Sequence, residues 1–182
     1  MNPLHFSAAP SPQAAPVPGA VPATNEHKRI LLLGLGNDIL CDDAIGLLVT
    51  QEVRRQLIDE DSIEALETSE MGLSLLDFIT GYEQLVIVDA IQTGKVPPGH
   101  LHEVDGDLLK QLPRISPHFL GVGEILALGR ELGLAMPLRV KIFAIEVEDP
   151  FTLGTQLSPG VKAALPGTVV RVLAAVRALA AG

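Results

Sequence analysis

The sequence has 182 residues and a mass of 19.3 kDa, is 47% hydrophobic and 19% charged, and has a mean hydropathy of +0.34. A chain this apolar can bury a core, so global disorder is excluded, and its length leaves little room for a second domain. The formal net charge of −9 argues against a broad nucleic-acid-binding surface, because neutralising phosphates requires clustered Lys and Arg.

Membrane and export signals are not apparent in the sequence. No apolar run reaches the roughly 18 residues of a membrane span, since Arg171 and Arg177 interrupt the apolar C-terminal stretch. The N-terminus has neither a basic region nor an unbroken apolar region of the kind found in signal peptides. A single cysteine cannot form an internal disulfide, which suits a reducing compartment. We therefore expect a cytoplasmic protein without a membrane span.

Residues 1–27 differ in composition from the rest of the chain. They contain six of the 14 prolines and many alanines. Proline removes backbone donors and alanine buries little surface. The sequence therefore predicts a disordered Pro/Ala-rich tail over 1–27 and a folded domain over 28–182.

The folded part alternates short apolar runs with amphipathic segments. In chain order, the pattern predicts a strand over 29–34, a helix over 43–58, a strand over 62–67, a short helix over 72–80, a strand over 84–89, a turn over 96–99, a strand over 100–104, a helix over 118–132, a strand over 138–147 and a helix over 159–180. Strands that alternate with helices indicate an α/β fold with a mostly parallel sheet covered on both faces.

Polar side chains gather where the predicted strands end. In an open α/β sheet, ligands bind beyond the carboxyl ends of the strands. The polar residues at these ends are Asn37, Asp42, Asp43, Glu67, Asp89, Glu146 and Glu148. Carboxylates that meet at one edge repel each other and raise one another's pKa. A bound cation is the simplest way to offset this repulsion.

A histidine adds a nitrogen ligand to this set. Ser116 is suited to cap a helix and Pro117 to occupy its first position, so His118 falls in the first helical turn. The positive helix end disfavours imidazolium and favours the neutral ring that binds metals. Two or three carboxylates with one imidazole suit a divalent ion that accepts oxygen and nitrogen ligands.

Each of these residues also has a purely structural interpretation. Asp43 can be an acid that complements a helix N-terminus, Asp89 can cap a turn, and His118 can be a hydrogen-bonded interior residue. His100 and His102 alternate on one strand face, which suits a metal but is more typical of a solvated edge. Sequence spacing alone does not place Asp43, Asp89 and His118 together.

Four motifs, in this order, resemble those of the [NiFe]-hydrogenase maturation endopeptidases. They are Gly34-Leu35-Gly36-Asn37, Asp42-Asp43-Ala44-Ile45-Gly46, Val86-Ile87-Val88-Asp89-Ala90 and Ile115-Ser116-Pro117-His118, and the resemblance extends over about residues 29–180. It implies a three-layer α/β/α sandwich around a twisted, mostly parallel sheet. It also implies an endopeptidase, aspartic-type by classification, that removes the C-terminal extension of a [NiFe]-hydrogenase large-subunit precursor after nickel insertion.

The resemblance assigns roles to particular residues. Asp43, Asp89 and His118 are implied to be catalytic and to engage nickel, which belongs to the precursor rather than to a permanent site. Asn37 is suited to stabilise the oxyanion. Glu67 is expected near the site, although Glu67-Thr68-Ser69-Glu70 stands where family members often have Asp-Gly-Gly. Water is the expected nucleophile, activated either by the metal or by a carboxylate.

Other functions remain open at this point. One is a nickel-binding maturation chaperone without protease activity, and another is a metal-dependent hydrolase of small peptides. A third is a dinucleotide-binding domain, because Gly34-x-Gly36 follows a strand and Glu67 ends the next one. Ile39 stands at the third glycine position, and acidic residues surround the place where a pyrophosphate would need a positive field.

Overall fold

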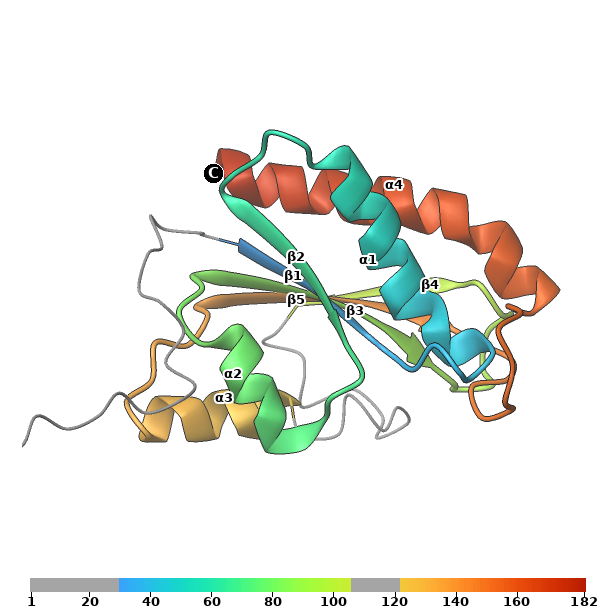
Figure 1. Cartoon of the computed structure of the whole chain (residues 1–182), viewed down its shortest axis with the longest axis horizontal. Helices are drawn as coiled ribbons and strands as arrows, with labels where there is room; N and C mark the ends of the chain where they lie inside the picture. Colours follow the sequence, from blue (N-terminus) through green and yellow to red (C-terminus); the bar gives the residue numbers. More distant parts are fainter. Residues whose placement is uncertain (1–29, 106–121) are drawn as a thin grey trace, which may run out of the picture.

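The structure, a computed structural model, describes residues 30–105 and 122–182 (Figure 1). Its elements are β1 (Ile30–Leu35), the 3-10 turn η1 (Asp42–Ala44), α1 (Ile45–Gln56), β2 (Ile63–Thr68), the 3-10 turn η2 (Gly72–Ser74), α2 (Leu75–Ile79), β3 (Gln84–Ile91), β4 (Leu101–Asp105), α3 (Val122–Glu131), β5 (Arg139–Glu146) and α4 (Pro159–Ala181).

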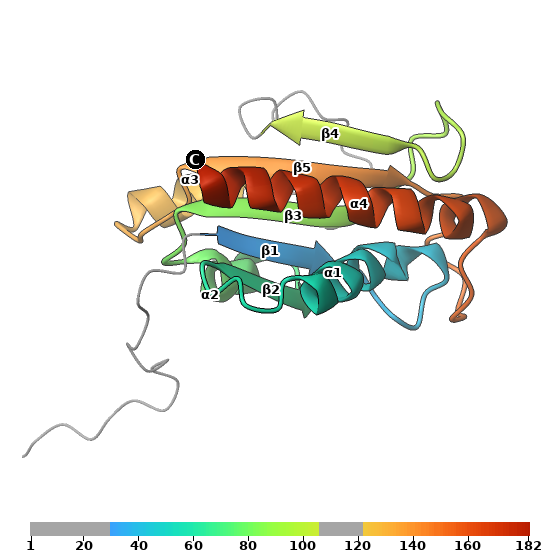
Figure 2. The same ribbon diagram turned by 90° about the horizontal axis from the view of Figure 1, so that it is seen from above.

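The strands form one five-stranded sheet in the order β2-β1-β3-β5-β4 (Figure 2). β2, β1, β3 and β5 are parallel, and β4 is antiparallel to β5 at the edge. Helices α1 and α4 cover one face of the sheet, and α2 and α3 cover the other (Figure 1). The predicted α/β fold, with three layers and a mostly parallel sheet, is confirmed.

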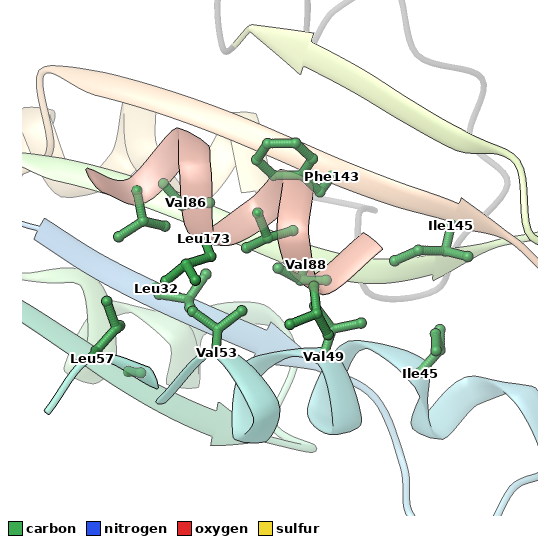
Figure 3. Packing of buried hydrophobic residues seen from close by; sticks show 14 of the residues in the cluster. Leu32, Ile45, Val49, Val53, Leu57, Val86, Val88, Phe143, Ile145 and Leu173 are labelled. Carbon is green, nitrogen blue, oxygen red and sulfur yellow. The ribbon is translucent and has the colours of Figure 1, made fainter. Parts of the chain in front are cut away.

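Two apolar clusters fill the spaces between the layers. In β1, Leu32 faces α1 and α4 together with Val88 and Phe143 (Figure 3), whereas Leu31 and Leu33 face the layer of α2 and α3. Side chains alternate across a strand, so a strand that is covered on both faces needs apolar residues at successive positions. This requirement explains the unbroken apolar runs of β1 and β3, all of whose residues are buried.

The N-terminal turn of α1 lies directly on the sheet. A Cβ atom on Gly46 would lie 2.2 Å from the carbonyl oxygen of Leu35 and 2.5 Å from that of Val88. A Cβ atom on Gly34 would lie 2.5 Å from Thr50 Oγ1. Glycine at both positions therefore permits α1 to approach the carboxyl ends of β1 and β3, where the candidate site lies.

The helix boundaries differ from the predicted ones in detail. The helix expected over 43–58 begins with the 3-10 turn η1 and ends at Gln56, and the helix expected over 72–80 likewise begins with η2. The predicted tail over 1–27 and the predicted start of the helix over 118–132 lie outside the described residues.

Helix α4 has 23 residues and, within the described part of the chain, is the one helix long and apolar enough to span a membrane by length and composition. The sequence pattern predicted no membrane span and did not single out this helix as a candidate. In the structure α4 packs on the sheet and on α1 through Val161, Val172 and Val176. The core helix of a soluble protein meets the same criterion, so α4 is weak evidence for a membrane span.

Candidate functional site

Asp43 lies in the turn that leads into α1. The turn η1 contacts β3, and the Asp43 side chain is buried. Gly36, which has a φ of 151°, passes so close that a Cβ atom there would lie 2.1 Å from the carbonyl oxygen of Asp43. A carboxylate beside a helix N-terminus is stabilised by the helix dipole and by the free N–H groups. The loop after β1 therefore holds Asp43 at the carboxyl end of the sheet.

Asp89 reaches the same end of the sheet from β3. It is fully buried, and its Oδ1 accepts a hydrogen bond of 2.8 Å from the backbone N–H of Ala90. A Cβ atom on Gly46 would lie only 3.2 Å from Asp89 Cα, so the first turn of α1 lies against this residue. Fold and packing thus bring the segments that contain Asp43 and Asp89 together.

Asp42, the neighbour of Asp43, joins two loops through hydrogen bonds. Its Oδ2 accepts hydrogen bonds from the N–H groups of Glu148 (3.1 Å) and Asp149 (3.0 Å). Its Oδ1 accepts a bond of 2.6 Å from the N–H of Ser158. The carboxylate is fully buried and links the β1–α1 loop to the β5–α4 loop. Two adjacent aspartates therefore have different environments.

Glu146 also has a structural environment. Its Oε1 accepts hydrogen bonds from the N–H groups of Thr93 (2.7 Å) and Gly94 (2.8 Å), and its Oε2 accepts one from Thr93 Oγ1 (2.8 Å). Burial raises the pKa of Glu146, but these hydrogen bonds outweigh it and hold the pKa below its ordinary value. His102 Nε2 lies 3.3 Å from Oε2, and the His100 ring meets the His102 ring edge-on. This cluster holds the β3–β4 loop.

The side chains of Asn37 and Glu67 also have defined contacts. Asn37 Oδ1 accepts a hydrogen bond of 3.2 Å from the N–H of Ile39, which leaves the amide NH₂ of Asn37 free to point elsewhere. Glu67 Oε1 lies 3.1 Å from Arg54 Nη1 of α1. Glu67 therefore faces α1 and has a cationic neighbour that the sequence pattern did not indicate.

His118 lies outside the described residues. Within residues 30–105 and 122–182, no three His, Cys, Asp or Glu side chains form a group that could hold a metal ion. Of the three residues predicted from the sequence to be catalytic, the described part thus contributes two buried carboxylates, Asp43 and Asp89, at the carboxyl end of the parallel sheet.

These features define a three-layer α/β/α protein with a buried acidic site beyond the ends of β1 and β3. The sequence model of the hydrogenase maturation proteases (HycI) matches residues 47–175. The hydrogenase 2 maturation protease of Escherichia coli (strain K12) is 31% identical over 151 residues, which cover 82% of this chain and 91% of that protein. The chain therefore belongs to the hydrogenase maturation protease family.

Solved structures agree with this assignment. The hydrogenase-maturating endopeptidase HybD from E. coli has a TM-score of 0.69 and 29% identity, over 82% of this chain and 92% of that one. The [NiFe] hydrogenase maturation protease HybD from Thermococcus kodakarensis has a TM-score of 0.61 and 27% identity, over 81% and 99% of the two chains. The protein is thus a maturation endopeptidase, a hydrolase, and a chaperone without protease activity is not favoured.

Proposed function

We propose that this protein removes the C-terminal extension of a [NiFe]-hydrogenase large-subunit precursor after nickel has been inserted, and that it does so in the cytoplasm. The family gives the reaction class. The observation that supports the assignment of the site is the meeting of the segments with Asp43 and Asp89, two buried carboxylates from distant parts of the chain. Buried carboxylates are costly unless hydrogen bonds or cations compensate them, so such sites are often functional.

Nickel enters this proposal as part of the substrate. Asp43, Asp89 and His118 are the proposed protein groups that recognise it, because two carboxylates and one imidazole suit a divalent ion of intermediate softness. A precursor without nickel lacks this contact, which makes cleavage depend on completed metal insertion. The metal polarises the groups bound to it and so supplies Lewis-acid chemistry.

The proposed reaction is hydrolysis by water, which agrees with an aspartic-type classification. A carboxylate of Asp43 or Asp89 accepts the proton of the attacking water and returns it to the leaving amine. Asn37 is proposed to donate its amide N–H to the developing oxyanion. In support of this role, the Oδ1 atom already accepts the N–H of Ile39, so the amide NH₂ is the group of Asn37 that remains to act as a donor.

The test is intact-mass analysis of the large-subunit precursor after incubation with this protein, with and without nickel loading. We expect loss of a C-terminal peptide from the nickel-loaded precursor alone. Asp43→Asn and His118→Ala should abolish cleavage, while Asp77→Asn, which changes an exposed acid of α2, should retain it. No cleavage of a precursor that another maturation protease can process, together with stoichiometric nickel binding, would instead favour the chaperone function.

A further inference from the structure

Beside the candidate site, two loops pair to form a short flap. We define the flap as residues 37–41 of the β1–α1 loop and residues 149–154 of the β5–α4 loop. Leu40 and Leu153 form an antiparallel bridge, and backbone hydrogen bonds of 3.0 Å join the loops on each side of it. The two loops lie side by side at the carboxyl end of the sheet in both views (Figures 1 and 2).

The flap has a defined shape because buried and local hydrogen bonds hold it. The fully buried carboxylate of Asp42 accepts three backbone N–H groups at the base of the β5–α4 loop. Asp149 Oδ1 accepts the N–H groups of Phe151 (3.2 Å) and Thr152 (3.0 Å), and the bonds from Thr152 lower the pKa of Asp149. A surface that is already ordered loses less conformational entropy when a partner binds.

Three large apolar side chains on this flap are exposed to solvent. Ile39 is 57% exposed, Phe151 66% and Leu153 74%. Each belongs to a short segment whose backbone is fixed by pairing, so the chain cannot readily bury these groups by folding inward. A cluster of exposed apolar side chains of this kind is typical of a surface that binds another protein.

The charge on the flap restricts what it can bind. The flap and the residues that flank it, 36–44 and 147–158, contain no Lys or Arg but five acids. Of these, Asp38 and Glu148 are exposed. A second copy of this chain in a two-fold contact would place the acidic flap against itself, which like charges oppose. A protein segment with Lys or Arg beside its apolar residues has the complementary charge.

We propose that the flap is the docking surface for the protein substrate, which it binds through an apolar segment flanked by basic residues. This inference rests on the proposed function and names the part of the enzyme that captures the precursor. Such a contact is made equally in the bound substrate and in the transition state. Its loss therefore raises KM and leaves kcat nearly unchanged.

The test compares Phe151→Ser and Leu153→Ser with Leu138→Ser, a control at a side chain that is 85% exposed. Leu138 lies just before β5, at the opposite end of that strand from the flap. KM and kcat for nickel-loaded precursor and the Kd for precursor are measured for each. We expect KM and Kd to rise about tenfold for each flap variant, with kcat and the melting temperature unchanged, and no change for the control. Asp38→Asn should weaken the salt dependence of Kd.

The outcomes separate the two proposals. If the flap variants and the control have equal KM and Kd, and the wild type cleaves the precursor, the docking proposal is overturned and the proposed function is upheld. Binding that the flap variants weaken, without cleavage by the wild type, would uphold docking and overturn the proposed function. A wild-type dimer that the flap variants convert to monomer would show that a second copy is the occupant, and would overturn the proposal.

Discussion

Replacing Asp42 by asparagine tests whether this buried carboxylate holds the two loops together. Its two oxygens accept three backbone N–H groups, from Glu148, Asp149 and Ser158. An asparagine has a single carbonyl oxygen, so it can serve two of these donors at most and presents its own NH₂ to the third. The third N–H then lacks an acceptor beside the fully buried side chain of residue 42.

The magnitude follows from these contacts. An unsatisfied buried donor costs about 1–3 kcal/mol, and a hydrogen bond to a neutral acceptor is weaker by about 1 kcal/mol than one to a charged acceptor. We therefore expect Asp42→Asn to lower the free energy of unfolding by about 3 kcal/mol. For a domain of this size, that corresponds to a fall in melting temperature of about 6–12 °C.

Urea denaturation and thermal unfolding, both followed by circular dichroism, measure the effect. The matched control is Asp61→Asn, an exposed acid before β2, which should change the free energy of unfolding by less than about 0.5 kcal/mol. If Asp42→Asn unfolds with the same free energy as the control, the hydrogen bonds of Asp42 do not stabilise the loops and the reasoning is refuted.

Two further predictions concern packing and acid stability. Gly46→Ala should destabilise the fold by about 2 kcal/mol or more, since the added methyl group would collide with the carbonyl oxygens of Leu35 and Val88. This variant should also cleave the precursor less well. The control is Gly123→Ala, whose added methyl group meets nothing within 4 Å and should leave both stability and cleavage unchanged. Because the pKa of Glu146 is lowered from its ordinary value of 4.5, this group stabilises the fold above that pH, and its contribution is lost as the pH falls through the lowered value. Glu146→Gln should therefore reduce the loss of stability between pH 6 and pH 3 in urea titrations, and an unchanged loss would contradict this assignment.

The order of the elements was accessible from the sequence because it depends on local patterns. The predicted strands over 29–34, 84–89 and 138–147 agree with β1, β3 and β5 to within about two residues at each end. Apolar runs bounded by glycine and by polar residues are typical of strands buried on both faces. Because ligands bind beyond the carboxyl ends of the strands in such a sheet, the sequence also predicted Asp43 and Asp89 as site residues. Their roles, and that of His118, stay predictions.

Other polar residues at the strand ends required the structure. The sequence pattern treated Glu67 and Glu146 as further acids of a common edge. In the structure, Glu67 lies beside Arg54, and Glu146 holds the β3–β4 loop. Neither contact follows from spacing along the chain, because Glu146 and its donor Thr93 are far apart in sequence and meet only when β3 and β5 pair.

The sequence by itself determined the fold class, the strands of a mostly parallel sheet and the positions at which a site could form, since periodicity and strand ends are properties of neighbouring residues. Only the tertiary structure decided which contacts each of two adjacent residues makes. Asp42 receives the N–H of Ser158, which is 116 residues away in the chain, while Asp43 lies beside Gly36 in the candidate site. Contacts of this kind depend on the path of the loops in space, which also places exposed Ile39 and Leu153 on one flap.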